Sequence, residues 1–498
     1  MSSPHQPPQH QHPQHPPYPP QPYQYQPQYQ APYQPQPPYQ PPYPSAPRPP
    51  RKNGGVIALV IGLAVLLVAG AGGAAFVFRD QLFGGGPGIE ADRELTYVVR
   101  DSFPSTYRPT EGGLEQLSAR WWTDKYLVRQ MPKQLVAYDL ANGNKAYAVD
   151  VPDTHYCNAS RQQSAKGYVA LLQGTRISGC RQLTIVDLRT GRRVWTKDLT
   201  SLLSGRNKLV SDFPRYDHRP VVLGERVHVP TDHGELVLNL ATGAVLSKPL
   251  PRAERRTGQC FTTHVATVGQ TGLAYRNCSP AGDEQRHLQA FTAAGKTLWT
   301  WNLPDERGNK ALLVGVLSVD PLLVRVFSDA GKEVWRVDQR TGKHQVVLRL
   351  NSTGPADPCE PSGGDGLYEC TQHVLSGKTL YVSERSGIAA YDVLSTRELW
   401  RGQWSTKHRL TPPLGLDAEG RPLAYLLPTL ETPGALVRAD PATGALSAVA
   451  TLPAAKSAPR RDLTQNPDEA EWHDGRLAFL RTRPSIRDAG YHATVVVR

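Results

Sequence analysis

The sequence lacks every short motif that would mark one of the common catalytic or metal sites. Its 498 residues contain no HExxH, Walker loop, GxSxG, CxxC or EF-hand spacing. These absences remove sequence support for a zinc peptidase, a nucleotide hydrolase, a hydrolase with a nucleophile elbow, a thioredoxin-like oxidoreductase and a calcium-binding hand. We therefore expect no catalytic residue, no metal site and no cofactor, and we interpret the protein as a non-enzyme.

Acidic residues are absent from the first part of the chain, where the earliest is Asp80. Residues 1–50 contain 20 prolines, 12 glutamines and 7 tyrosines, and such a segment cannot bury enough apolar surface to fold. Residues 1–53 are therefore predicted to be a disordered cytoplasmic tail. Its PxxP-like runs could bind an aromatic-lined groove, but we favour a solvated tether.

Charge is also absent from residues 54–78, which read GGVIALVIGLAVLLVAGAGGAAFVF. At about 1.5 Å per residue, a helix of this length crosses a bilayer core of about 30 Å. The basic residues within 48–52 precede it, so the positive-inside tendency places the N-terminus in the cytoplasm. We predict an uncleaved single-pass anchor in the cell membrane, a linker over 79–93 and an extracytoplasmic domain over 94–498. A cleaved signal peptide is the alternative.

A sequence motif of about eleven residues recurs through the last four hundred residues. Its copies begin at Ala137, Ile185, Leu238, Ala290, Arg336, Ala390 and Arg438. A spacing near fifty residues indicates a repeat architecture, and helical periodicity is nearly absent from this region. Each copy has the pattern of a β-hairpin, with a further strand candidate before it. Three to four strands every fifty residues predict the blades of an all-β propeller.

The turn of each hairpin carries aspartate and glycine at fixed places. Aspartate can accept hydrogen bonds from turn amides just downstream, and glycine supplies the positive φ that closing the turn requires. The candidate turn residues are Asp139, Gly143, Asp187, Gly191, Gly243, Gly295, Asp338, Gly342, Asp392, Asp440 and Gly444, with Thr396 in one glycine place. The aromatic residue four positions later is expected to pack against the neighbouring blade rather than on a cofactor. These aromatic residues are Tyr147, Trp195, Trp299 and Trp400.

An incomplete eighth unit follows the seven hairpins. Its strand candidates are 472–480 and 491–498, and a hairpin partner is missing from the sequence around them. Residues 94–101, ELTYVVRD, lie before the first repeat and have the alternation of a strand. We predict an eight-bladed propeller closed by pairing of 94–101 with 491–498, because an open sheet edge would leave backbone groups unpaired. A seven-bladed ring is the alternative.

The repeat, a small residue followed by x-Asp-x-x-Thr-Gly-x-x-x-Trp, resembles that of pyrroloquinoline-quinone-type β-propellers. The likeness is close at 137–147, 185–195 and 390–400 and extends over about 94–498. The superfamily includes quinoprotein alcohol dehydrogenases, which use a vicinal disulfide and a calcium ion, and the propeller lipoprotein of the BAM complex. This sequence has no Cys-Cys pair and no haem-attachment CxxCH. The resemblance therefore implies the WD40-like propeller fold without the cofactor, and the tail looks more like those of actinobacterial membrane proteins.

Six cysteines occur, all beyond the predicted membrane segment. Six cysteines allow fifteen pairings, but they fall two by two between successive hairpins, and cysteines of one blade can reach each other. The pairs predicted in this way are Cys157–Cys180, Cys260–Cys278 and Cys359–Cys370. An even number on the outer side fits an oxidising compartment.

The formal net charge is +12, of which the three basic residues of the tail account for +3 and the remainder for +9. A basic surface attracts anions such as lipid headgroups or a cell-wall polymer. An extracytoplasmic location and the absence of an aromatic-basic motif argue against nucleic acid. We interpret the propeller as a module that binds, senses or scaffolds a protein or cell-envelope partner. The alternatives are a divergent quinoprotein or other enzyme using the propeller channel, and an envelope-assembly factor similar to the BAM propeller.

Overall fold

The computed structural model describes most of the chain from residue 91 onward. The described residues are 91, 93–102, 119–131, 134–150, 155–175, 179–203, 219–231, 234–249, 260–278, 285–306, 309–310, 312–328, 330–350, 355–359, 367–384, 387–404, 408–429, 432–452, 463–465, 467, 469–481 and 492–498. All of them belong to the second of two compact units, Phe76–Arg498. The predicted tail over 1–53 and span over 54–78 lie outside the described residues, and so does nearly all of the linker over 79–93. Within the described part, no helix has the length and apolar character needed to cross a membrane.

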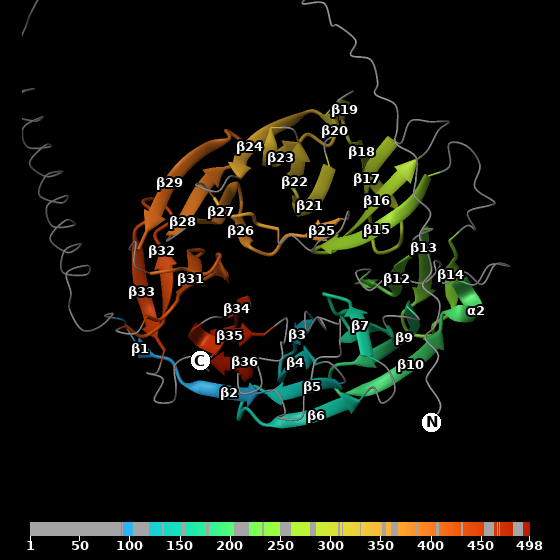
Figure 1. Ribbon diagram of the computed structural model, residues 1–498, viewed down its shortest axis with the longest axis horizontal. Coiled ribbons are helices and arrows are strands. Elements are labelled where there is room, and N and C mark those ends of the chain that lie inside the picture. The colour runs from blue at the N-terminus through green and yellow to red at the C-terminus, as the bar shows by residue number, and fades with distance from the viewer. Residues whose placement is uncertain are drawn as a thin grey trace, which may run out of the picture. The chain divides into compact units, whose positions relative to one another are not determined.

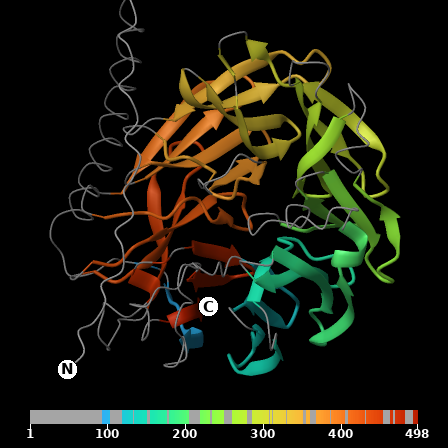
Figure 2. The same ribbon diagram turned by 45° about the vertical axis from the view of Figure 1, so that its right-hand side comes forward.

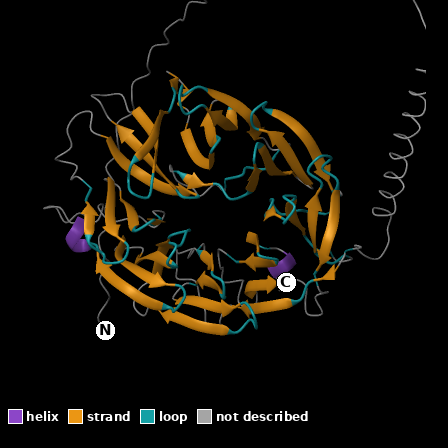
Figure 3. Cartoon of the chain, turned by 180° about the vertical axis from the view of Figure 1, so that it is seen from behind, coloured by secondary structure: helices purple, strands orange, loops and turns teal. Residues whose placement is uncertain are grey.

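The strands of the described residues form eight sheets that follow one another around a ring (Figures 1 and 2). Each of these eight sheets contains four antiparallel strands, and successive sheets use successive parts of the chain. Two of the eight have a fifth strand that pairs parallel, and a further two-stranded sheet is separate from them. Strand dominates the cartoon in Figure 3, where helix is confined to short pieces. This arrangement is an eight-bladed β-propeller, and we number the blades 1 to 8 from the first complete one.

The bounds of the elements are as follows. Blade 1 is β3 (Arg120–Trp122), β4 (Tyr126–Gln130), β5 (Gln134–Asp139) and β6 (Lys145–Asp150), and blade 2 is β7 (His155–Ala159), β8 (Tyr168–Thr175), β9 (Gly179–Asp187) and β10 (Arg192–Asp198). Blade 3 is β11 (Val221–Leu223), β12 (Arg226–Thr231), β13 (Gly234–Asn239) and β14 (Val245–Ser247), and blade 4 is β15 (Cys260–Val268), β16 (Thr271–Cys278), β17 (Gln285–Phe291) and β18 (Thr297–Asn302). Blade 5 is β21 (Leu312–Val319), β22 (Leu322–Ser328), β23 (Gly331–Val337) and β24 (His344–Leu350), and blade 6 is β26 (His373–Ser376), β27 (Thr379–Glu384), β28 (Gly387–Asp392) and β29 (Arg397–Gln403). Blade 7 is β30 (Gly415–Leu416), β31 (Pro422–Leu426), β32 (Ala435–Ala439) and β33 (Leu446–Thr451), and blade 8 is β34 (Glu469–His473), β35 (Arg476–Leu480), β36 (His492–Val497) and β2 (Tyr97–Ser102). The remaining elements are β1 (Arg93–Glu94), β19 (Asp305–Glu306), β20 (Asn309–Lys310), β25 (Tyr368–Glu369), α2 (Thr200–Leu203) and the 3-10 turn η4 (Leu463–Gln465).

The hydrophobic core lies between neighbouring sheets. In the described residues it separates into eight clusters, and each cluster joins two adjacent blades. The second strands of the blades are covered on both faces, which is why β31 reads PLAYL and is buried along its whole length. Such continuous apolar runs are what a strand packed on both sides requires.

Blade 8 is completed by a strand from the other end of the domain, as predicted. β2 pairs antiparallel with β36, and the register places Val99 opposite Val496 and Asp101 opposite Thr494. Val99 is 1% exposed and packs in the cluster between blades 8 and 1. The ring is therefore closed by backbone hydrogen bonds between strands nearly four hundred residues apart.

The closing segment differs from the prediction at its first residues. Glu94 was expected to pair within blade 8, but β1 pairs parallel with β33 of blade 7, with Glu94 opposite Thr451. Leu95 is fully buried between the two blades, and its amide donates to the Thr451 carbonyl at 2.8 Å. The pairing strand of blade 8 therefore begins at Tyr97, and one short segment ties the outer edges of two blades.

The hairpin turns show the geometry that their aspartates and glycines predict. In blade 7, Asp440 accepts the amides of Ala442 and Thr443, and Gly444 has a φ of 74°. These backbone hydrogen bonds and the Thr443 hydroxyl lower the pKa of Asp440, the hydroxyl having the largest effect. Thr396 holds the equivalent place in blade 6 with a φ of 58°, a conformation that is uncommon for a β-branched residue.

In blades 1, 2 and 6 the aromatic residue of the outer strand connects the blade to the turn of the next one. The indole of Trp195 donates to the Leu240 carbonyl at 2.9 Å, and that of Trp400 donates to the Pro441 carbonyl at 2.7 Å. Tyr147 makes the same link, through its hydroxyl, to the Leu188 carbonyl at 2.5 Å. These rings lie against the turn glycines, where a Cβ would meet them. The turn glycine is thus required both because its φ is positive and because it has no Cβ atom to collide with the ring.

Blade 4 departs from this pattern. Its turn has Thr292 in the aspartate place and is one residue shorter, with the Gly295 amide donating to the Thr292 carbonyl at 2.8 Å. The indole that reaches the next turn belongs to Trp301, which donates to the Gly342 carbonyl at 3.2 Å. Trp299 was expected to pack against the neighbouring blade, and it does so, half-buried, on the cluster between blades 4 and 5.

We expect Val99→Asp to destabilise the whole ring, because it places an unpaired carboxylate between blades 8 and 1. The free energy of unfolding should fall by on the order of 3 kcal/mol or more. Arg100→Gln is the matched control, since Arg100 is exposed on the same strand. Thermal unfolding of the full chain measures both, and equal midpoints for the two variants would contradict the closure.

Gly444→Ala and Gly420→Ala separate the two requirements on a turn glycine. Both residues have a positive φ, of 74° and 78°, but a Cβ at Gly444 would lie 2.5 Å from the Trp400 ring, whereas a Cβ at Gly420 meets nothing within 4 Å. We expect Gly420→Ala to cost about 1–2 kcal/mol from backbone strain. Gly444→Ala should cost a further ~1–3 kcal/mol from overpacking. Chemical denaturation measures the difference, and equal costs would show that the ring contact is unimportant.

Candidate functional site

The two faces of the propeller are built differently. Because the strands of each blade alternate in direction, the turns after the first and third strands lie on one face, and the connections after the second and fourth strands lie on the other. We call these the turn face and the loop face. Most turn-face connections are tight, as between Leu223 and Arg226, and the longest connections, such as the one from Asp198 to Val221, lie on the loop face. Long connections on a rigid scaffold are the usual place for binding.

The disulfides secure strand ends at the loop face. Cys260 and Cys278 lie opposite each other at the ends of β15 and β16 and are bonded, with 4.0 Å between their Cα atoms. Cys359 and Cys370 are also bonded, with a Cα separation of 4.2 Å. Cys180 is buried and disulfide-bonded at the start of β9, while the Cys157 side chain lies outside the described residues.

The connection from blade 5 to blade 6 is held to both blades. The Ala356 amide donates to the Ser383 carbonyl of blade 6 at 2.8 Å. Beyond the Cys359–Cys370 disulfide, β25 adds a parallel fifth strand to blade 5 inside its first strand. This segment therefore has a fixed structure on the ring side of the blades, and Figure 1 shows β25 toward the middle of the ring.

Buried charged side chains also gather at loop-face strand ends. Arg325 of β22 donates to Asp357 at 2.6 Å, and Lys332 lies 3.3 Å from the same carboxylate. Arg129 of β4 is fully buried and donates to the Arg481 carbonyl of blade 8 at 2.7 Å. Because a buried charge is tolerated only when it is paired or hydrogen-bonded, these contacts make the blade positions specific.

One carboxyl group at this face has a raised pKa. Burial raises the pKa of Glu384, the last residue of β27, and the charge of Glu398 adds to the effect, while Arg401 opposes it. The Arg401 guanidinium lies 3.4 Å from the Glu384 carboxylate. Such perturbed carboxyls can mark catalytic sites, but ion-pair networks perturb pKa values as well.

His373 is a partly buried base between blades 5 and 6. Its Nε2–H donates to the Leu317 carbonyl of blade 5 at 3.0 Å, and its Nδ1 is buried without a hydrogen-bond partner. Burial lowers the pKa of His373 to about 4, and the hydrogen bond to Leu317 opposes this shift only in part. Protonation would add a charge at Nδ1 that no group there is placed to accept.

The inner edge between blades 8 and 1 carries a second polar group. Arg120 of β3 forms ion pairs with Glu469 and with Glu471, the latter at 2.5 Å, both from β34. Two residues along the same strands, the Trp122 ring stacks on His473 with 4.7 Å between ring centroids. These contacts join the first strands of the two blades at the place where the ring closes.

A concentration of positive charge lies on blade 2. Residues 155–198 contain eight basic residues against two acidic ones, Asp187 and Asp198. The basic residues are Arg161, Lys166, Arg176, Arg181, Arg189, Arg192, Arg193 and Lys197. Both aspartates accept backbone amides, Asp187 from Arg189 and Asp198 from Thr200.

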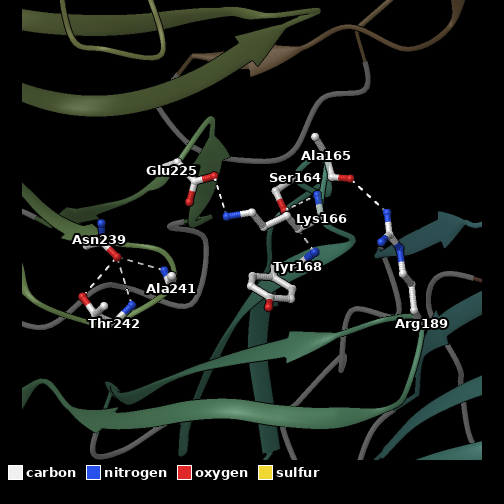
Figure 4. A network of polar contacts seen from close by, with 9 residues as sticks. All are labelled: Ser164, Ala165, Lys166, Tyr168, Arg189, Glu225, Asn239, Ala241 and Thr242. Atoms are coloured by element: carbon white, nitrogen blue, oxygen red, sulfur yellow. Dashed lines mark hydrogen bonds and ion pairs between the residues drawn. The ribbon is translucent and has the colours of Figure 1, made fainter.

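Two exposed members of this group, Lys166 and Arg189, lie in turn-face connections of blade 2, and Figure 4 shows both from close by. We call Lys166, Arg189 and Arg192 the basic edge of blade 2; all three side chains are exposed. Lys166 lies 3.0 Å from Glu225 of blade 3, and Arg189 donates to the Ala165 carbonyl at 3.0 Å. An exposed ion pair of this kind contributes about 1 kcal/mol or less, so the cations remain available to an anion.

Sequence analysis assigned the turn residues and cysteines to their blades but did not find the basic edge. It noted a charge of +9 beyond the tail without locating it. The signal was present, because a count of charges repeat by repeat singles out 155–198. The buried charges of Arg129, Arg325 and Glu384 were also missed, although each interrupts or ends an otherwise apolar strand candidate.

The fall of stability in acid should depend on His373. Its pKa is about 4 in the folded protein and about 6.5 unfolded, so the unfolded chain binds an extra proton between these values. Its contribution is complete above pH 6.5 and is lost toward pH 4, by about 3 kcal/mol. His373→Gln should therefore flatten this part of the pH profile of unfolding, and His473→Gln should not. Parallel profiles for wild type and His373→Gln would contradict this assignment.

No model of a known protein family matches the sequence, and no curated protein matches it. Several solved β-propellers resemble the structure. The C-terminal WD40 domain of Sif2 is 10% identical, with 82% of this chain and 99% of that chain covered and a TM-score of 0.42. Hsv2 of Kluyveromyces lactis is 10% identical over 67% of this chain and 97% of that one, with a TM-score of 0.37. The WD40 domain of Neurospora crassa Pan2 is 13% identical over 68% and 94%, with a TM-score of 0.38. The eight-bladed propeller fold is established here by the strand pairing itself.

Proposed function

We propose that the protein is a single-pass membrane protein whose extracytoplasmic, quinoprotein-like propeller is a non-catalytic binding module for an anionic cell-envelope partner. The observation that carries the proposal is the basic edge of blade 2. Lys166, Arg189 and Arg192 come from two turns of one blade and are exposed together. Asp187 in the same turn keeps its negative charge while it accepts the Arg189 amide, so the edge has three cations against one carboxylate of its own blade.

The stiffness of the ring supports a binding role. Each seam between blades has its own buried apolar cluster, and β1 and β2 join the last two blades to the chain entering the domain. A surface that is already ordered loses little conformational freedom when a partner binds. Electrostatic attraction would bring an anion to such an edge and would weaken with salt.

The location rests on two features. Residues 54–78 have the length and composition of a membrane span, with basic residues before them. The disulfides of blade 4 and of the connection from blade 5 to blade 6 fit an oxidising compartment. We infer that the N-terminus is cytoplasmic and the propeller is outside, where protease added to intact cells should digest it and leave residues 1–53 protected.

The binding proposal predicts that neutralising the basic edge weakens polyanion binding. We expect the triple variant Lys166→Gln/Arg189→Gln/Arg192→Gln to bind polyphosphate or poly-L-glutamate at least tenfold more weakly than the wild type at low salt, which corresponds to about 0.5 kcal/mol for each removed charge. The full chain in detergent and fluorescence anisotropy of the labelled polymer provide the measurement.

The control variant is Lys378→Gln/Arg397→Gln, which removes exposed cations from the turns of blade 6. It should leave the affinity within about twofold of the wild type. Preference for one polymer would distinguish a phosphate-rich partner from a carboxylate-rich one. Equal losses in the two variants would show that net charge, and not the basic edge, determines binding.

A further inference from the structure

Three potential metal ligands converge at the loop-face corner of blade 4. The two sulfurs of the Cys260–Cys278 disulfide and a ring nitrogen of His287 all lie within 4.8 Å of one another. They come from β15, β16 and β17, three consecutive strands of one rigid sheet. Cys260 and His287 are partly exposed, whereas Cys278 is 4% exposed. The Cys359–Cys370 disulfide does not occur in any such group within the described residues.

The hydrogen bond of His287 leaves one ring nitrogen with a lone pair. His287 Nδ1 lies 2.6 Å from Asn302 Oδ1, and an amide oxygen can only accept, so Nδ1 carries the hydrogen and donates it. The lone pair is then on Nε2. A ligating histidine that donates its second ring hydrogen to a neighbouring oxygen is the usual arrangement in metal sites, because it fixes the tautomer and the ring orientation.

We propose that reduction of the Cys260–Cys278 disulfide converts this corner of blade 4 into a binding site for one zinc ion. The ligands are the two cysteine sulfurs and His287 Nε2, with water in the fourth position. Zinc–sulfur bonds of about 2.3 Å and a zinc–nitrogen bond of about 2.0 Å place tetrahedral ligands roughly 3.5–3.8 Å apart. The sulfurs, bonded to each other in the disulfide, move apart to this range only after the bond breaks. The inference concerns blade 4 alone and does not depend on the proposed anchor or on the basic edge.

The switch requires a reductant, which we take to be a dithiol. One thiolate of the dithiol attacks the partly exposed Cys260 sulfur, the Cys260–Cys278 bond breaks, and the second thiolate closes the dithiol into a cyclic disulfide. Two electrons and two protons pass to the cysteines, which become thiols. Zinc then replaces both thiol protons, because the thiolate is the metal ligand. In the disulfide state the sulfurs carry no such charge, so the site is closed.

Metal binding to the full chain in detergent tests the proposal. A phosphine reduces the disulfides without competing for the metal, and a chromogenic chelator reports zinc affinity. Cobalt(II) provides a spectroscopic signature, since tetrahedral coordination and thiolate charge transfer have characteristic bands. We expect one high-affinity ion in the reduced wild type and in reduced Cys359→Ser/Cys370→Ser. We expect at least a tenfold loss of affinity in His287→Gln, and no high-affinity ion in Cys260→Ser/Cys278→Ser or in the oxidised wild type.

A stability measurement covers the case in which reduction loosens the blade. Zinc should then raise the melting temperature of the reduced wild type, because it binds the folded state, and should raise that of His287→Gln much less. Asn302→Ala should weaken zinc binding about 10–100-fold through the orientation of His287. Equal zinc binding by the wild type and Cys260→Ser/Cys278→Ser would overturn the proposal. Indifference of the affinity or the cobalt spectrum to His287→Gln would overturn it as well.

Discussion

The pairing of β2 with β36 is the interaction on which the rest of the ring depends. Without it, blade 8 would lack its outer strand and the core between blades 8 and 1 would lose Val99. A ring cannot tolerate one weak blade, because each sheet is covered by its two neighbours and each seam has its own apolar cluster. The extra pairing of β1 with β33 extends the closure to blade 7. The segment entering the domain therefore fastens two blades at once.

The contacts between neighbouring blades explain why so simple a sequence motif recurs. An aspartate and a glycine form the turn, and the aromatic residue of one blade covers the glycine of the next. Such a copy contributes a turn glycine to the contact with one neighbouring blade and an aromatic residue to the contact with the other. The repeat therefore specifies how neighbouring blades join as well as how a hairpin folds. Where blade 4 has a shorter turn, the tryptophan that reaches blade 5 is two residues further along. The contact is retained although the motif of blade 4 differs from the other copies.

The two faces divide structural and individual features between them. The turn face is the more regular of the two, with a shorter turn in blade 4 and Thr396 in place of glycine in blade 6, and a charge count locates the basic edge of blade 2 on it. The loop face differs from blade to blade. Features that occur there at one place each are two disulfides, the connection from blade 5 to blade 6 that is hydrogen-bonded to both blades, and the buried pair of Arg325 with Asp357. Disulfides hold strand ends where long connections would otherwise leave them loosely constrained. The proposed zinc site uses one of these disulfides, so the same bond would provide both stability and a response to reduction.

The amino-acid sequence by itself determined the blade and predicted eight blades and the strand that closes the ring, with seven blades left as the alternative that the strand pairing excludes. These follow from local rules, since a turn needs its own aspartate and glycine, and period-two patterning reports a strand wherever it pairs. The sequence also placed each cysteine with a neighbour in its own part of the chain. Local patterning could not show that Glu94 pairs with blade 7 and not with blade 8. A two-residue strand has the same sequence pattern whether it pairs parallel or antiparallel. Tertiary structure alone decided which polar side chains lie close together. Arg129 donates to the Arg481 carbonyl, and His287 lies beside Cys260 and Cys278. Sheet register and blade packing bring these residues together, and their spacing in the sequence carries no signal of it.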